Sequence, residues 1–136
     1  MTEPNANSLR VRPMRPTDLE CVLDWRNHWD VRRFMFTQKM IEPNEHQRWY
    51  ESAINDSRKK LYVFENNQQP LGFVSLIEAA PGGVVDWGFY TAPHALKGTG
   101  RQLGLTALHH AFTQLHVRKV CGQAIAFNQR SIDFHL

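Results

Sequence analysis

Two glycines between basic residues, in the run Lys97-Gly98-Thr99-Gly100-Arg101, form the segment of the sequence best suited to chemistry. Glycine has no Cβ, so the backbone at Gly98 and Gly100 can turn sharply and direct its N–H groups at an anion. A helix starting here would add unsatisfied amides and the positive end of its dipole. With the charges of Lys97 and Arg101, the segment predicts a site for a diphosphate.

A strand and a helix are expected to hold this glycine loop. The run Val84–Tyr90 mixes β-branched and aromatic residues after a turn at 81–83, which indicates a strand. Helical spacing follows the loop, with large apolar residues at Leu105, Leu108, Phe112 and Leu115. Neither G-x-x-x-x-G-K-[ST] nor G-x-G-x-x-G fits these glycines, so the common nucleotide-binding motifs are not predicted.

Composition limits the class of protein. With 136 residues, 42% of them apolar and 11% aromatic, the chain is expected to form a single folded domain over 9–136 after a flexible lead-in over 1–8. The lead-in lacks the apolar region of a secretory signal, and no apolar run of about 18 residues predicts a membrane span. Cys21 and Cys121 lack metal-ligand spacing and are interpreted as reduced, so the cytoplasm is expected. A net charge of +3 from scattered basic residues favours a small anionic ligand over nucleic acid.

The remaining patterns predict an α+β order of β-α-α-β-β-β-α-β. We expect a strand over 9–13, a helix from a capping box at 17–20 to about 27, and a short helix or loop over 31–40. A helix from Pro43 should follow, with Trp49, Ala53 and Ile54 buried. Next we expect a hairpin of 61–65 and 71–78 around a turn of four or more residues and, after the glycine loop and its helix, a strand over 119–127. The first strands would form an antiparallel meander, and the crossover helix would make the last strand parallel to its neighbour.

The glycine loop resembles the acyl-CoA pyrophosphate loop of the GNAT superfamily of N-acyltransferases, [QR]-x-x-G-x-[GA]. The segment Ala95–Gly100 matches its glycines and departs at the first position. The resemblance implies the GNAT-type fold, a mixed, mostly antiparallel sheet flanked by helices, and it implies acetyl-CoA as co-substrate without a metal. The positions that it implies for binding acetyl-CoA are Phe89, Tyr90, Lys97, Gly98, Thr99, Gly100, Arg101, Asn128 and Ser131.

Longer segments resemble the N-acetyltransferases of the pseudaminic-acid pathway. They are W-R-N-H at 25–28, E-H-Q-R at 45–48 and W-G-F-Y-T-A-P at 87–93. This resemblance implies a nucleotide-sugar acceptor, acetylated on the 4-amino group of UDP-4-amino-4,6-dideoxy-N-acetyl-β-L-altrosamine, with Arg26, Asn27 and His46 bordering the sugar pocket. Members of that family continue into two closing strands, so the chain is expected to be C-terminally incomplete. Whether two copies of the chain form a homodimer is left open by the sequence.

Acetyl transfer needs a proton donor for the departing thiolate and a neutral amine. In the GNAT pattern N-x-x-S/A-x-x-[LF]-Y, a tyrosine protonates the thiolate, and His135 stands at that position here. Strand alternation places Tyr90 on the same, polar face as Asp86 and Gly88, as a second acid or a substrate contact. Gly88 is expected to mark a strand irregularity. Glu78 is the candidate base, acting through water.

Two other functions remain open at this point. A GNAT enzyme acetylating a protein N-terminal amine would share the glycine loop, although it gives no reason for the W-R-N and E-H-x-R segments. A non-catalytic acyl-CoA-binding fragment would agree with a histidine at position 135 and with the expected missing strands. Turnover of an amino sugar or a peptide, against binding without turnover, separates the three.

Overall fold

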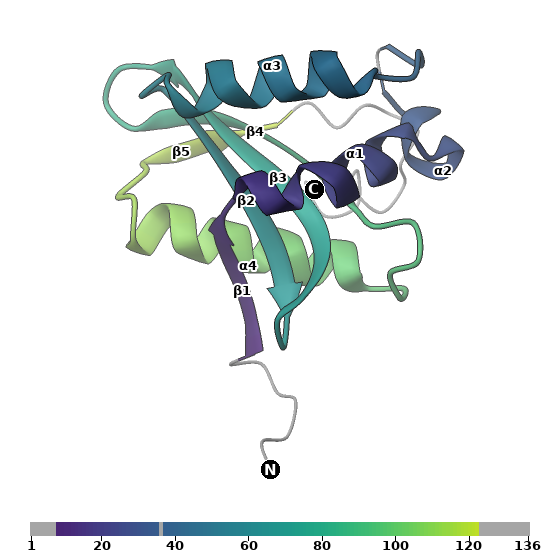
Figure 1. The fold of residues 1–136 in the computed structure, drawn as a ribbon. Coiled ribbons are helices and arrows are strands. Elements are labelled where there is room, and N and C mark those ends of the chain that lie inside the picture. The colour runs from purple at the N-terminus through teal and green to yellow at the C-terminus, as the bar shows by residue number, and fades with distance from the viewer. Residues whose placement is uncertain (1–7, 36, 123–136) are drawn as a thin grey trace.

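One mixed sheet forms the centre of the computed structural model, which describes residues 8–35 and 37–122. Its strand order is β1-β2-β3-β4-β5 (Figure 1). The strands are β1 (Leu9–Pro13), β2 (Lys59–Asn66), β3 (Gln69–Ala80), β4 (Val84–Thr91) and β5 (Lys119–Cys121). Neighbours among β1 to β4 are antiparallel, whereas β5 pairs with β4 in parallel. The predicted meander and parallel last strand are therefore confirmed, and the part of the predicted fifth strand after residue 122 lies outside the described residues.

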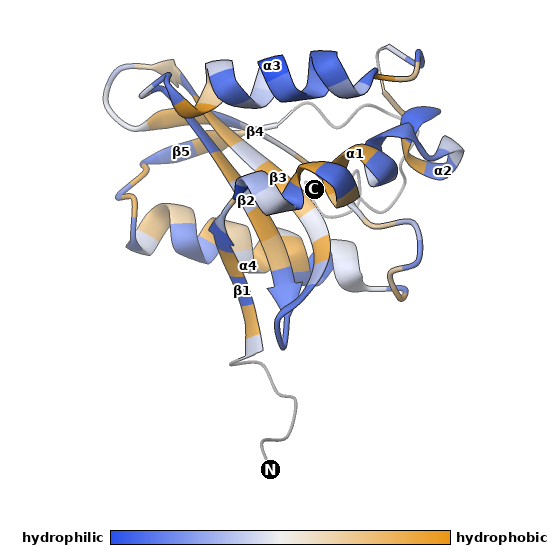
Figure 2. Cartoon of the chain, viewed as in Figure 1, coloured by the Kyte–Doolittle hydropathy of each residue, from blue (hydrophilic) through white to orange (hydrophobic). Residues whose placement is uncertain are grey.

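Helices cover both faces of the sheet, as Figure 1 shows. They are the 3-10 turn η2 (Pro16–Asp18), α1 (Leu19–Asn27), α2 (Trp29–Arg32), α3 (Pro43–Ile54) and α4 (Thr99–Thr113). One apolar cluster, including Val22 and Phe73, lies under α1 and α3. A second, including Val74, Trp87 and Leu103, lies under α4. Hydrophobic residues lie along the central strands and on part of α4, whereas α3 is mostly hydrophilic (Figure 2). The sheet lies between the two clusters and so separates two cores.

The β2–β3 hairpin is tighter than predicted. Asn67 and Gln68 alone connect the strands, both with positive φ, 55° and 71°. Two residues with positive φ match the twist of a hairpin, and asparagine tolerates this conformation better than most residues. The expected turn of four or more residues is thus wrong, because Asn66 and Gln69 pair with each other inside the ladder.

Helix α4 bears out only part of the predicted stripe: Leu108 and Leu115 pack against the second cluster as expected, but the most buried residues are different ones. It begins at Thr99, inside the glycine loop, and its sheet-facing residues include Leu103, Ala107 and Ala111. Leu105 and Phe112, expected inside, are 50% and 44% exposed. Alanines let the helix backbone approach the sheet closely, whereas the prediction followed the larger side chains.

Helix α3 shows the same kind of shift. Pro43 occupies its first turn and Ala53 is buried, both as predicted, but the other buried residues are His46 and Tyr50. Trp49 is 37% exposed and Ile54 is 55% exposed. A polar group can face the core when it is hydrogen-bonded there, and hydrophobic spacing does not reveal such a residue.

An ion-pair network replaces the capping box predicted for α1. Asp18 Oδ2 accepts a hydrogen bond from the Arg15 N–H at 2.7 Å, and both carboxylate oxygens accept from the Arg12 guanidinium at 2.8 and 2.9 Å. Arg12 Nε donates to Glu65 on β2 at 2.9 Å. Burial opposes the charge of both carboxylates, but the hydrogen bonds prevail. Those from Arg12 and Arg15 lower the pKa of Asp18, and those from Arg10 and Arg12 lower the pKa of Glu65. Arg12 therefore joins β1, β2 and the start of α1.

Within residues 8–35 and 37–122, no helix combines the length and apolar character that a bilayer crossing requires. The same part of the chain brings together no three histidine, cysteine or acidic side chains in a metal-binding arrangement.

Candidate functional site

The glycine loop is an open turn between β4 and α4. Gly98 is the N-cap of α4, with φ of 95°, a conformation that side chains other than glycine rarely adopt. A Cβ built at Gly98 would meet no atom within 4 Å. Thr99 closes the turn from inside, since its Oγ1 and N–H both donate to the Leu96 carbonyl, at 2.7 and 3.1 Å. Lys97 and Gly98 are exposed, so an anion can reach the backbone.

Main-chain donors are available in this turn. Among the described residues, the N–H groups of Gly98, Gly100 and Arg101 have no hydrogen-bond acceptor, and the Gln102 N–H is the first that donates to the regular helical acceptor, Gly98 O, at 3.1 Å. The start of a 15-residue helix adds its dipole to these donors. The donor set, with the exposed side chains of Lys97 and Arg101, fits a diphosphate.

Strand β4 leads into the turn and presents two aromatic residues on opposite faces. Phe89 packs beside Trp87 on the α4 side, with ring centroids 4.9 Å apart. Tyr90 packs on Phe73 on the α1 side, with centroids 5.3 Å apart. The predicted alternation is confirmed. The face of Tyr90, however, is apolar rather than polar as predicted, because α1 and α3 cover it.

Gly88 does not mark a bulge. It pairs in register with Ser75, and the irregularities of this sheet, within the described residues, lie between Phe64 and Glu65 and between Glu78 and Ala80. A Cβ at Gly88 would sit 3.7 Å from Ser75 Oγ, an ordinary contact. The expectation of an irregular strand at Gly88 is therefore wrong.

Arg26 and Tyr90 interact electrostatically on the α1 side of β4. Burial raises the pKa of the Tyr90 phenol, and the nearby Arg26 charge opposes that rise. Burial likewise lowers the pKa of Arg26, against the attraction of Tyr90. Arg26 Nη2 donates to the Thr37 carbonyl at 2.9 Å, whereas Nη1 is buried and has no partner within the described part of the chain. A buried guanidinium N–H without a hydrogen bond is costly in free energy, so this atom marks a place for a group that accepts a hydrogen bond.

Asn27 and His46, the other two residues expected to border the sugar pocket, make structural hydrogen bonds to backbone groups. Asn27 donates from Nδ2 to the Ile41 carbonyl at 2.8 Å and accepts from the Ile41 N–H at 2.7 Å. His46 is 6% exposed, and its Nε2 lies 3.0 Å from the Leu19 carbonyl, to which the Nε2–H tautomer donates. Burial lowers the pKa of His46 despite that hydrogen bond. The structure thus uses both side chains to join α1 to the segment that precedes α3 and to α3 itself.

Glu78, the predicted base, does not lie at this place. Glu78 is exposed at the end of β3, where its N–H donates to the Arg58 carbonyl at 2.8 Å. It pairs with Val85, five residues before Tyr90, which is about 17 Å along a strand. His135, Asn128 and Ser131 lie outside the described residues.

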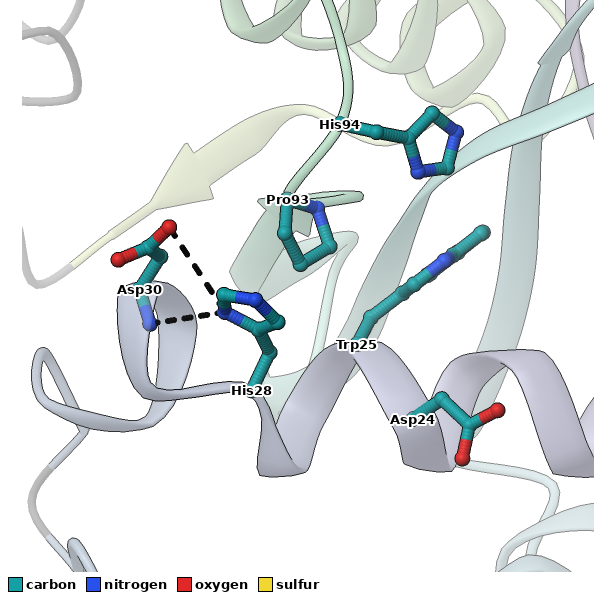
Figure 3. A pocket seen from close by; sticks show the side chains of 6 residues that line it. All are labelled: Asp24, Trp25, His28, Asp30, Pro93 and His94. Atoms are coloured by element: carbon teal, nitrogen blue, oxygen red, sulfur yellow. Dashed lines mark hydrogen bonds and ion pairs between the residues drawn. The ribbon is translucent and has the colours of Figure 1, made fainter.

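A shallow pocket of about 450 Å³ separates α1 from the loop that precedes the glycine turn. Figure 3 shows its lining side chains: Asp24, Trp25, His28, Asp30, Pro93 and His94. His28 Nδ1 accepts from the Asp30 N–H at 3.1 Å, and the Asp30 carboxylate lies 3.7 Å from the same nitrogen. The sequence gives no sign of this pocket, because α1 and the loop are about 65 residues apart along the chain.

Arg32 was also missed. The sequence showed it only as part of a short basic cluster with Arg33. Its guanidinium lies 4.7 Å from the Trp29 ring centroid and donates to the carbonyls of Asn27 and Gln38, both at 3.0 Å. The three-residue spacing of Trp29 and Arg32 was the available signal, since such pairs are neighbours on a helix.

Comparisons with known proteins agree with this geometry. The acetyltransferase (GNAT) domain model matches residues 8–135. Acetyltransferase PseH of Campylobacter jejuni subsp. jejuni serotype O:23/36 (strain 81-176) is 28% identical over 118 residues, which cover 87% of this chain and 73% of that protein. PseH of C. jejuni serotype O:2 is 27% identical over the same shares.

Solved structures give the same family. Spermidine N-acetyltransferase from Vibrio cholerae, in complex with CoA and spermine, superposes with a TM-score of 0.80 at 25% identity, over 95% of this chain and 78% of that one. AAC(6')-Ib in complex with ribostamycin and coenzyme A has a TM-score of 0.81 at 20% identity, covering 94% and 80%, and so shows the shared fold. An open turn of free amides beside β4, in a chain matched over 8–135, leads to one conclusion: this protein belongs to the GNAT acetyltransferases, enzymes that use acetyl-CoA.

Proposed function

We propose that this enzyme transfers the acetyl group of acetyl-CoA to the 4-amino group of a UDP-linked amino-deoxy sugar, the acceptor of the pseudaminic-acid pathway. The similarity to proteins named PseH supports this acceptor class. The observation that carries the proposal is the buried, unpaired Nη1 of Arg26 beside Tyr90. This N–H lacks one hydrogen-bond acceptor among the described residues, and a hydroxyl or phosphate oxygen of a sugar nucleotide that reaches this buried atom would supply it.

The charge of Arg26 discriminates between acceptors. A hydrogen bond to a charged group contributes about 1.5–3 kcal/mol, roughly a tenfold to 150-fold gain in affinity. A polyamine offers only positive charge and N–H donors, so it would leave Nη1 unpaired and would be repelled by the guanidinium. The electrostatics on the α1 side of β4 thus favour an anionic, oxygen-bearing acceptor.

The proposed reaction is direct attack. The neutral amine attacks the thioester carbonyl, the carbon–sulfur bond breaks, and the departing thiolate receives a proton. Tyr90 is one proposed donor, since a phenol is protonated at neutral pH at its ordinary pKa of about 10, and burial raises that pKa further. His135 is the other, by its place in the sequence motif. Glu78 is proposed as the base only with His135 as the donor, because Glu78 lies about 17 Å along the sheet from Tyr90, too far for one water to bridge.

A second candidate is an acceptor with a cationic amine and no phosphate. Asp24 and Asp30 border the pocket beside Pro93, and their carboxylates would attract an ammonium group. Spermidine, the substrate in the name of one structural neighbour, represents this class. A peptide with a free N-terminal amine represents the protein-acetylating alternative.

An acceptor panel separates these functions. We would measure CoA release with acetyl-CoA and, in turn, the UDP-4-amino sugar, spermidine or the peptide. The proposal expects the highest kcat/KM for the sugar nucleotide. Arg26→Gln should raise the KM for the sugar nucleotide at least tenfold. Arg33→Gln should leave that KM unchanged, because it removes the charge of an exposed arginine whose Cζ lies 4.4 Å from the Phe34 ring centroid. Faster turnover of spermidine, or an unchanged KM in Arg26→Gln, would contradict the proposal, and acetyl-CoA binding without any turnover would favour the non-catalytic alternative.

A further inference from the structure

The segment 37–41, called the 37–41 loop below, is tied by its main chain to α1 and α2. It has no helix or strand of its own. Arg26 Nη2 donates to the Thr37 carbonyl, Arg32 Nη1 donates to the Gln38 carbonyl, and Asn27 bonds both the N–H and the carbonyl of Ile41. These contacts use the backbone of the loop, and Gln38 Nε2 adds one from the loop itself, to the Arg33 carbonyl at 3.1 Å. The path of the loop therefore depends largely on side chains of α1 and α2.

Arg32 is the tie in the middle of the loop. Its Nε donates to the Asn27 carbonyl at the end of α1, at 3.0 Å, while its Nη1 reaches Gln38 at the same distance. The Trp29 ring lies against the guanidinium, with 4.7 Å between the ring centroid and Cζ. Two carbonyls and an aromatic ring hold the planar fork of the Arg32 guanidinium in one orientation. A lysine ammonium is not planar and cannot make the same set of contacts.

The loop in turn holds Arg26. The Thr37 carbonyl is the acceptor for Nη2, one residue from the Gln38 carbonyl that Arg32 holds. A displaced loop would release Nη2, and the guanidinium would be free to turn away from Tyr90. The charge of Arg32 also opposes that of Arg26, so the two arginines are kept near each other by the loop between them.

We propose that Arg32 is a positioning residue for acceptor recognition: it fixes the 37–41 loop so that Arg26, anchored on Thr37, presents its free Nη1 to the acceptor. This proposal rests on the proposed function only in taking the Arg26–Tyr90 side as the acceptor side. Arg32 does not touch the acceptor. Its guanidinium shape matters, and its charge does not.

Steady-state kinetics of Arg32→Lys and Arg32→Gln in the full chain test this role, with Arg33→Gln as the matched control. Arg32→Lys keeps the charge and loses the fork. Both Arg32 variants should raise the acceptor KM about tenfold, the effect of one misplaced charged hydrogen bond, with kcat and the KM for acetyl-CoA within twofold of wild type. An unchanged acceptor KM in Arg32→Lys would overturn the proposal, and so would an equal rise in the KM for acetyl-CoA.

Hydrogen exchange supplies a readout that does not need the acceptor to be known. The Ile41 amide, which donates to Asn27 Oδ1, should exchange at least tenfold faster in Arg32→Gln and at the wild-type rate in Arg33→Gln. No acceleration at Ile41 would overturn the role of Arg32. Acceleration at Ile41 together with turnover of spermidine but not of the sugar nucleotide would refute the proposed acceptor while supporting the positioning role, so the two failures are distinct.

Discussion

Substitution of the turn glycines separates fold stability from cofactor binding. Gly98 and Gly82 both have left-handed backbones, with φ of 95° and 88°, and a Cβ at either would meet no atom closer than 3.8 Å. Gly98→Ala and Gly82→Ala should therefore each destabilise the fold by about 1–2 kcal/mol, the cost of a left-handed L-residue. Only Gly98 belongs to the open turn, so only Gly98→Ala should also weaken acetyl-CoA binding.

The size of the binding loss follows from the free amides. If one main-chain N–H no longer points at the diphosphate, the loss is about 1.5–3 kcal/mol, or roughly tenfold to 150-fold in Kd. Gly100→Asp should show the opposite effect on stability. It removes a glycine from α4 and places a carboxylate at the positive end of the helix, with about 0.5–1 kcal/mol gained. Its carboxylate would repel the diphosphate, so acetyl-CoA affinity should fall while stability rises.

Calorimetric titration with acetyl-CoA and denaturant unfolding measure the two quantities on the same samples. The expected pattern is a weaker Kd in Gly98→Ala and Gly100→Asp and a wild-type Kd in Gly82→Ala. If Gly98→Ala and Gly100→Asp bind acetyl-CoA as tightly as wild type, the turn does not hold the diphosphate and the reasoning from its free N–H groups fails.

Three other outcomes are expected. Arg12→Met leaves the carboxylates of Asp18 and Glu65 buried without this partner and should lower the free energy of unfolding by about 3–5 kcal/mol. Arg10→Met should lower it by less than about 1 kcal/mol, because the Arg10 side chain is 57% exposed. Equal losses in the two variants would contradict the network. The pKa of both carboxylates is lower in the folded state, so the unfolded chain binds more protons in acid. Their contribution to the free energy of unfolding should therefore be full above about pH 4.5 and disappear as pH falls through the folded pKa values. Denaturation measured at several pH values checks this, and stability unchanged down to pH 3 would refute it. Tyr90→Phe should keep the fold and lower kcat about 10²- to 10⁴-fold if the phenol donates the proton; a kcat within twofold of wild type would leave that role to another group.

The order of elements could be predicted because it depends on local patterns. Alternation, a proline at the start of α3 and the glycine turn each specify backbone geometry within a few residues. The helix faces could not be predicted in the same way. Ala107 and Ala111 face the sheet because small side chains allow close packing, a property of the contact between two elements.

The acceptor side shows the same division. A resemblance brought Arg26 and Asn27 to attention, but the sequence gives no means of telling an arginine with a free N–H from an asparagine fully engaged with Ile41. By itself, the sequence determined that a strand, an open glycine turn and a helix follow one another, since conformational preference acts between neighbours in the chain. Only the tertiary structure decided which donors remain unpaired, because burial and pairing depend on residues distant in sequence that meet in space.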